Sequence, residues 1–148
     1  MTPTPSDEYL RSAVLTATPE QLQMMLYDGA IRFATQGREA LERHDYSTSC
    51  EQLLRAQKIV VELENGLRPE VNPSLCQQLA ALYRFVYRRL VDANVHQDPD
   101  AADDALRILH HQRTTWEMLL QRLASEAAAT AGEATPVEPA GSPISIEC

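Results

Sequence analysis

The chain has 148 residues and a formal net charge of −8, because 13 lysines and arginines oppose 21 aspartates and glutamates. This length predicts a single domain. Nucleic acids and anionic membrane surfaces bind proteins through basic patches, so the acidic composition argues against both partners. No stretch approaches the ~18 consecutive apolar residues of a membrane span, and the first residues lack the pattern of a signal peptide. We expect a cytoplasmic protein whose three widely spaced cysteines are reduced.

Residues 1–17 begin polar and proline-rich and then become apolar at Tyr9, Leu10, Val14 and Leu15. This pattern predicts a mobile N-terminal arm that can include a short helical turn.

A helix is predicted from about Pro19 to Glu42. Thr18 is its expected N-cap, Pro19 occupies the first helical position, and Gln21 completes a capping box. Beyond them, apolar residues follow a 3.6-residue period on two neighbouring faces. The first face comprises Leu22, Met25, Leu26, Gly29 and Phe33, and the second comprises Met24, Tyr27, Ile31 and Ala34. Such a helix must bury both faces, either in its own domain or against a partner.

Two more helices are predicted over 46–64 and from Pro73 onward. Asn65-Gly66 marks the end of the first, since both residues tolerate a left-handed backbone. Asn72-Pro73 supplies a cap and a first-turn proline for the second. Its expected core stripe is Leu75, Leu79, Leu82, Val86 and Leu90, with Tyr83 and Tyr87 beside it.

A fourth helix is predicted to begin at Asp98-Pro99, where aspartates in the first turns suit the positive end of the helix dipole. After about Glu126 the chain consists mainly of Ala, Thr, Gly, Pro and Glu, which predicts disorder. The fold expected from these elements is all-α. It is an antiparallel up-and-down four-helix bundle over 18–126, with the N-terminal arm at 1–17 and a disordered acidic tail at 127–148.

No catalytic or metal-binding constellation can be assembled from the residue pattern. Glycine-rich phosphate loops and a Gly-x-Ser-x-Gly motif are absent, and no Glu-x-x-His pair is present for a di-iron bundle. We therefore predict no enzyme activity, no cofactor and no metal. A histidine phosphotransfer module is an alternative, with His110 or His111 as the phosphorylated residue, although the Lys-Gly that commonly follows such a histidine is missing. A generic helical adaptor is a further alternative.

Two features leave alternatives open. Gly29 and Gly37 lie inside a predicted helix, where they either allow close packing against a neighbouring helix or leave room for a partner backbone. Tyr83 and Tyr87 are either ordinary bundle residues or the lining of an open groove, since tyrosine is enriched at interfaces.

Four segments in order resemble the FliS family of flagellin-specific export chaperones. They are an early tyrosine, Tyr9; the stretch 15–31 (LTATPEQLQMMLYDGAI); second- and third-helix segments at 56–63 and 79–94; and Trp116 within 113–117. No single segment is diagnostic, but their order and spacing match over roughly residues 9–120.

The resemblance implies a cytosolic four-helix protein that binds the disordered C-terminal segment of flagellin. It further implies that the chaperone blocks premature polymerisation and delivers flagellin to the flagellar type III export apparatus, with the export gate as a further candidate partner. The arm around Tyr9 would lie over the bundle when no client is bound. A monomer or a weak homodimer is expected.

The client surface predicted from residues off the main core stripes has nine members. They are Tyr9, Leu10, Met24, Tyr27, Ile31, Ile59, Leu63, Tyr83 and Tyr87.

Overall fold

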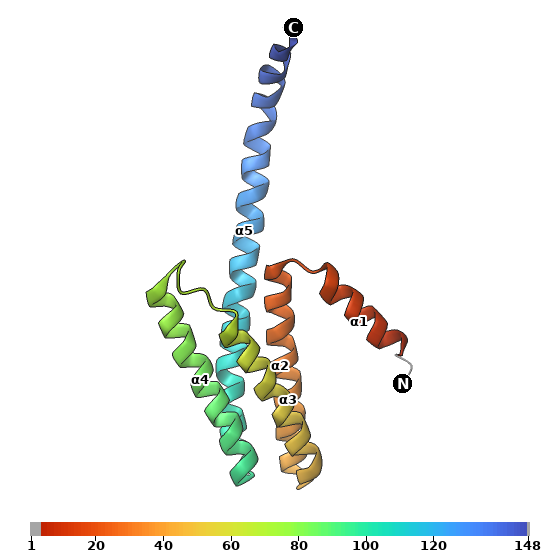
Figure 1. Ribbon diagram of the computed structural model, residues 1–148, viewed down its shortest axis with the longest axis vertical. Helices are drawn as coiled ribbons and strands as arrows, with labels where there is room; N and C mark the ends of the chain where they lie inside the picture. The colour runs from red at the N-terminus through yellow and green to blue at the C-terminus, as the bar shows by residue number, and fades with distance from the viewer. Residues whose placement is uncertain (1–3, 148) are drawn as a thin grey trace. The chain divides into compact units, whose positions relative to one another are not determined.

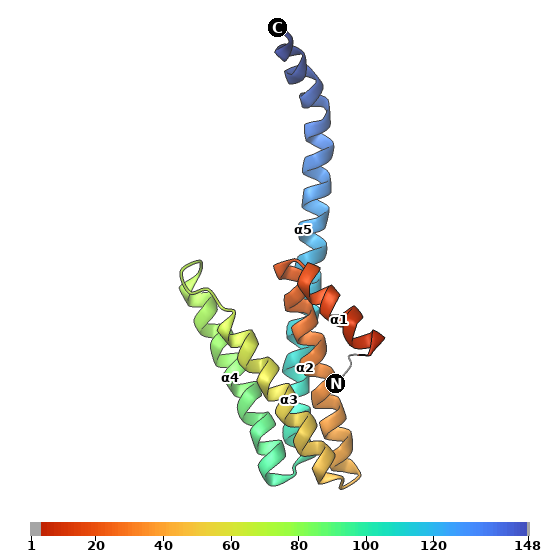
Figure 2. The same cartoon turned by 45° about the vertical axis from the view of Figure 1, so that its right-hand side comes forward.

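The computed structural model describes residues 4–147, with side chains over 4–132, and within that range it is all-α. Its helices are α1 (Pro5–Thr16), α2 (Pro19–Glu42), α3 (Tyr46–Asn65), α4 (Pro73–His96) and α5 (Pro99–Glu147) (Figure 1). Two compact units divide the chain at Thr114 and Thr115, so α5 runs through both. In the first unit, α2, α3, α4 and the beginning of α5 run alternately up and down, as predicted (Figure 2).

The helix starts follow the predicted caps. The backbone N–H of Gln21 donates to the Thr18 hydroxyl at 3.1 Å, and the Thr18 N–H donates to the Gln21 side chain at 3.0 Å. Asn72 accepts a hydrogen bond from the N–H of Leu75, which begins α4 at the predicted residue.

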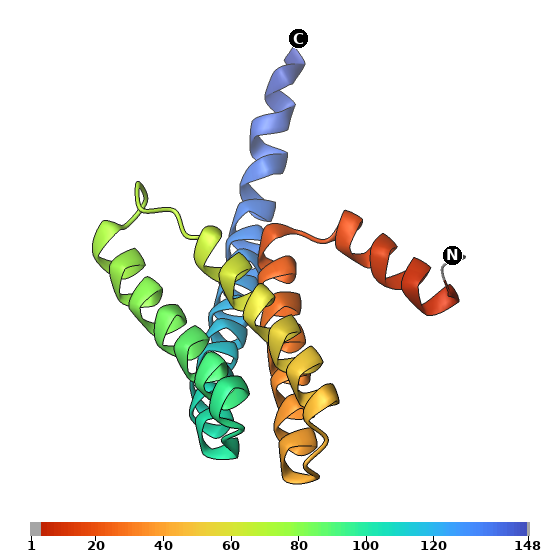
Figure 3. The same ribbon diagram turned by 60° about the horizontal axis from the view of Figure 1, so that its bottom comes forward.

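The N-terminal arm is a helix of 12 residues, where a mobile segment with a short turn was expected. The reason is a second capping box, since Thr4 and Asp7 exchange the same two hydrogen bonds as Thr18 and Gln21. The sequence Thr-Pro-Ser-Asp before α1 has the same pattern as Thr-Pro-Glu-Gln before α2, so the signal was present. No residue of α1 is buried, and α1 leads away from α2 (Figure 3). The arm therefore does not lie over the bundle in this structure.

The end of α3 differs from the prediction that Asn65-Gly66 closes it with a left-handed backbone. Gly66 closes α3 with φ −80°, which is not left-handed. The left-handed backbone occurs instead at His44 (φ 59°) and Gln97 (φ 53°), just after α2 and α4.

The contact between α2 and α3 is close because α2 has glycine at two positions on its contact face. A Cβ atom added at Gly37 would lie 2.7 Å from Cγ of Leu53, which is fully buried. A Cβ atom at Gly29 would lie 3.0 Å from Cδ1 of Ile59. Of the two readings of these glycines, the structure supports close packing between helices.

The start of α5 joins the same bundle through small residues and ion pairs. Ala101, Ala102 and Ala105 are fully buried. On the flanks, Arg38 of α2 binds Asp103 at 2.6 Å and Arg89 of α4 binds Asp104 at 3.0 Å. The acidic first turns of α5 therefore bind arginines of two other helices, in addition to suiting the helix dipole.

The core stripe of α4 is shifted from the predicted one. Tyr83, Val86, Leu90 and Ala93 are buried, whereas Leu75 is 48% exposed and no residue from 73 to 82 is buried. The leucines at the start of α4 have the spacing of a core stripe, but this part of the helix has no covering layer within the first unit.

α5 is described as helix to Glu147, and the expected disorder of the tail stays a prediction. The division into an arm, a bundle and a tail at 17 and 126 stays a prediction. Cys50 is a free, exposed thiol, and Cys148 lies outside the described residues.

Replacing Gly37 by Ala is expected to destabilise the protein by about 1–3 kcal/mol, because the new methyl group overlaps Leu53 in a packed core. Urea unfolding followed by circular dichroism measures the change. Gly132→Ala is the matched control, because no atom lies within 4 Å of a Cβ added there; it should be neutral or slightly stabilising. Equal effects of the two substitutions would contradict the close contact.

Protonation of the Asp104 carboxylate is expected to cause part of the loss of stability in acid. Hydrogen bonds from Arg107 and Arg89 lower the pKa of this carboxyl group. A lowered folded-state pKa means that the stabilisation is complete above the unfolded pKa of about 3.9 and is lost as the pH falls through the folded pKa. Asp104→Asn should flatten the pH dependence of urea midpoints below about pH 4, whereas Glu70→Gln in the exposed loop should not. An unchanged acid limb in Asp104→Asn would refute this assignment.

Candidate functional site: an apolar groove between α3 and α4

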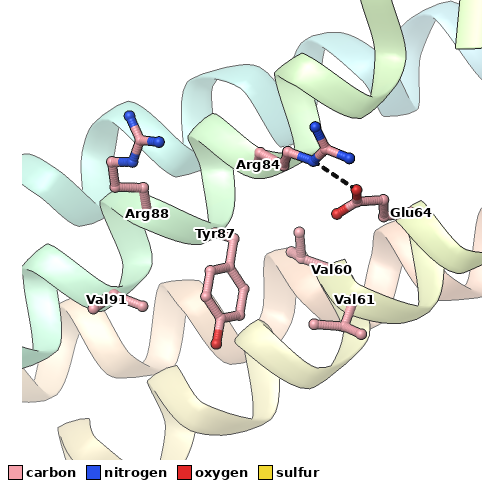
Figure 4. Close-up of a pocket in the computed structure, with 7 residues that line it drawn as sticks. All are labelled: Val60, Val61, Glu64, Arg84, Tyr87, Arg88 and Val91. Carbon is pink, nitrogen blue, oxygen red and sulfur yellow. Dashed lines mark hydrogen bonds and ion pairs between the residues drawn. The ribbon is translucent and has the colours of Figure 1, made fainter. Parts of the chain in front are cut away.

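A concavity with a volume of about 430 Å³ lies between α3 and α4 in the first unit (Figure 4). Its lining residues are Val60, Val61, Glu64, Arg84, Tyr87, Arg88 and Val91. We refer to this set as the α3/α4 groove.

Valines from both helices and one aromatic ring make the groove apolar. Val60 is buried beneath it, while Val61 and Tyr87 are about 40% exposed. The Tyr87 ring points from α4 toward α3 (Figure 4). An amphipathic helix could cover these side chains and remove their apolar surface from water.

An ion pair marks one end of the groove. The Arg84 Nε–H donates to Oε2 of Glu64 at 2.8 Å and so connects α4 to α3 (Figure 4). Arg88 lies one turn further along α4 and is exposed. A pocket with an apolar floor and a few charged groups at its rim is typical of binding sites for protein segments.

The rotation of α4 that exposes Tyr87 is set by Tyr83. The hydroxyl groups of Tyr83 and Tyr27 are hydrogen-bonded at 2.6 Å in the core, and Gln23 donates to the Tyr27 hydroxyl at 3.4 Å. Burial raises the pKa of Tyr83, with the hydrogen bond to Tyr27 as a second cause. The two tyrosines of α4 therefore have different roles, Tyr83 in the core and Tyr87 in the groove.

Three members of the predicted client surface are in the core, which contradicts the assumption that they lie off it. Tyr27, Tyr83 and Leu63 are each no more than 3% exposed. Tyr83 falls beside the core stripe predicted for its helix, and Tyr27 lies on the second of the two apolar faces predicted for α2. Residues one position beside a stripe are therefore the ones most easily misassigned.

The other six predicted residues are accessible but do not form one site. Tyr9 and Leu10 are exposed on α1, with Tyr9 at 76%. Met24 and Ile31 on α2 and Ile59 on α3 are half-buried. Tyr87 is the one that lines the α3/α4 groove.

Sequence reasoning missed most of the groove. Arg84, Arg88 and Val91 follow the i, i+4, i+7 spacing of one helix face, which is the signal that could have found them. The groove requires knowledge of which helix lies next to α4, and sequence periodicity does not contain it.

The second unit has its own exposed apolar residues. Met118 and Leu119, with Thr115 and Arg122, line a shallow hollow of about 260 Å³ on α5. Leu123 continues this exposed face one turn later.

The described residues contain no helix with the length and apolarity needed to cross a membrane. Nor do they contain a cluster of three or more His, Cys, Asp or Glu side chains arranged to hold a metal ion.

The fold and the groove place the chain in the class of all-α bundle proteins that have an open apolar groove between neighbouring helices. Comparison with known proteins narrows this class. The family model described as "Flagellar protein FliS" matches residues 2–123. The chain belongs to the FliS family, as its resemblance to that family predicted.

Individual relatives agree with this assignment. The flagellar secretion chaperone FliS of Bacillus subtilis (strain 168) is 32% identical over 117 residues, covering 79% of this chain and 86% of that protein. FliS of Salmonella typhimurium (strain LT2) is 32% identical over 111 residues, covering 74% of this chain and 82% of that protein. A crystal structure described as a flagellar chaperone from bacteria aligns with a TM-score of 0.66 over 80% of this chain and 99% of that chain. At 18% identity, that match shows a shared fold.

The buried tyrosine pair can be tested by a double-mutant cycle. Tyr27→Phe and Tyr83→Phe should each destabilise the protein by about 1–3 kcal/mol, because each leaves the hydroxyl group of the other tyrosine buried without its hydrogen-bond partner. The double variant removes both hydroxyl groups, so its loss of unfolding free energy should be clearly smaller than the sum of the two single losses. Strictly additive losses in urea unfolding would show that the two hydroxyls do not interact.

Proposed function

We propose that this protein is an export chaperone for flagellin. It acts in the cytoplasm, binds the C-terminal segment of newly made flagellin, prevents that segment from polymerising early, and delivers flagellin to the flagellar type III export apparatus. No catalytic step is part of this function. The protein works as a monomer or a weak homodimer, and the export gate is a candidate second partner.

Membership of a family of flagellar secretion chaperones supports the general class of this function. The α3/α4 groove is the observation that supports this part of the molecule as the client-binding surface, because Tyr87 and Val61 remain exposed there beside the buried Val60. A client segment that is disordered when free and amphipathic when helical can bury its apolar face there. Part of the free energy of these contacts offsets the entropy that the segment loses when it becomes ordered, and this keeps the complex reversible.

The six accessible residues of the predicted client surface remain candidates for secondary contacts. A long client can wrap over several grooves, since segments that fold on binding cover large surfaces. Tyr9, Leu10, Met24, Ile31 and Ile59 belong to this secondary group, and Tyr87 belongs to the principal site.

Calorimetric titration with the C-terminal segment of flagellin from the same bacterium should give one-to-one binding with a negative heat-capacity change, because apolar surface is buried. Tyr87→Ala should weaken binding by about 1–2 kcal/mol, as expected for an aromatic residue in an interface pocket. Urea unfolding should show that the variant remains folded.

Phe85→Ala is the matched control. Phe85 is also an aromatic residue of α4 and is 39% exposed, like Tyr87, but it does not line the groove. This control should bind flagellin as the unmodified protein does. Equal losses in the two variants would place the principal contact elsewhere, and absence of binding by the unmodified protein would refute the proposed function.

A further inference from the structure

The rim of the α3/α4 groove carries a charge opposite to that of the whole protein. Arg84, Arg88 and Glu64 are its ionisable residues, so its formal charge is +1, whereas the chain carries −8. Glu64 already binds Arg84 through a 2.8 Å contact. Within the described residues, no carboxylate lies within ion-pair distance of Arg88, which is exposed.

A helix bound in the groove would change the surroundings of Arg88. Arg88 lines the groove together with Tyr87 and Val91, so a helix bound against them lies beside the Arg88 side chain. Removing water from an unpaired charge costs free energy unless an opposite charge replaces the water. A carboxylate next to the client's apolar stripe meets this requirement, and a lysine in the same place adds repulsion.

We propose that the α3/α4 groove selects amphipathic helices that carry an acidic residue beside their apolar stripe, with Arg88 as the residue that determines this specificity. Arg84 contributes less, because Glu64 competes for it. This inference rests on the proposed function, which makes a flagellin segment the ligand of the groove. It adds which helical segments of that client can bind there.

The net charge of the protein and the charge of the groove predict opposite preferences. Long-range attraction to a chain of charge −8 favours a basic ligand, whereas the rim of the groove favours an acidic one. Two synthetic helical peptides with identical apolar stripes, one flanked by glutamates and the other by lysines, distinguish the two effects. Fluorescence anisotropy at about 50 mM salt should show the glutamate peptide binding about three- to tenfold more tightly, the range of one or two rim ion pairs. Tighter binding of the lysine peptide, or binding of neither peptide, would overturn the proposal.

Substitutions then test the assigned residues. Arg88→Gln should weaken binding of the glutamate peptide about threefold, and Arg88→Glu should reverse the preference between the two peptides. Glu64→Gln should tighten binding of the glutamate peptide, because it releases Arg84. Arg43→Gln is the control, since it removes the same charge at the exposed end of α2. An effect of Arg88→Gln no larger than that of Arg43→Gln would refute the role of Arg88.

Binding measurements with the C-terminal segment of flagellin distinguish this inference from the proposed function. If the C-terminal segment binds and Arg88→Gln weakens its binding, both stand. If the segment binds equally well to the protein and to Arg88→Gln, the inference fails and the chaperone function stands. If the segment does not bind while the peptides show the expected preference, the proposed function fails and the charge selectivity of the groove stands.

Discussion

The hydrogen bond between the hydroxyl groups of Tyr27 and Tyr83 determines which face of α4 is inside the bundle. Both groups are buried, so each needs a partner, and at 2.6 Å they satisfy each other across the core. This requirement fixes the rotation of α4 relative to α2 more strictly than aliphatic packing alone, because a hydrogen bond is directional and hydrophobic contact is not. With Tyr83 inside, Tyr87 one turn later has to lie toward the side of α4 that faces α3.

The groove is a consequence of this arrangement. Gly37 lets α2 and α3 approach closely, and the first turns of α5 are held by Arg38 and Arg89. The outer edge between α3 and α4 lacks a comparable glycine contact and keeps an apolar hollow there. A bundle with an incompletely filled edge offers a surface for a helical segment while its own core stays packed. This is a physical requirement for a chaperone that stays folded with and without its client.

The fold was largely predictable from sequence, and the site was not. Helix starts depend on local chemistry, so Thr18, Asn72 and their prolines placed α2 and α4 correctly. The helical part of the arm is longer than the expected turn, because Thr4 and Asp7 form a capping box that the sequence analysis did not use. The core residue Tyr83 and the groove residue Tyr87 are four residues apart, which is only about 40° of rotation around α4, and periodicity alone does not show where the core ends. Tyr83 and Tyr87 illustrate the limit, since only the partner hydroxyl of Tyr27 distinguishes them.

The most direct test of the account is to map the binding site by NMR. Isotope-labelled protein is titrated with the C-terminal segment of flagellin, and the amide shifts are followed residue by residue. The account predicts that the largest shifts cluster on both sides of the α3/α4 groove, around Val61 and around Tyr87 to Val91, with small shifts at Phe85. Large shifts confined to α1 and α2, with the groove residues unchanged, would contradict it.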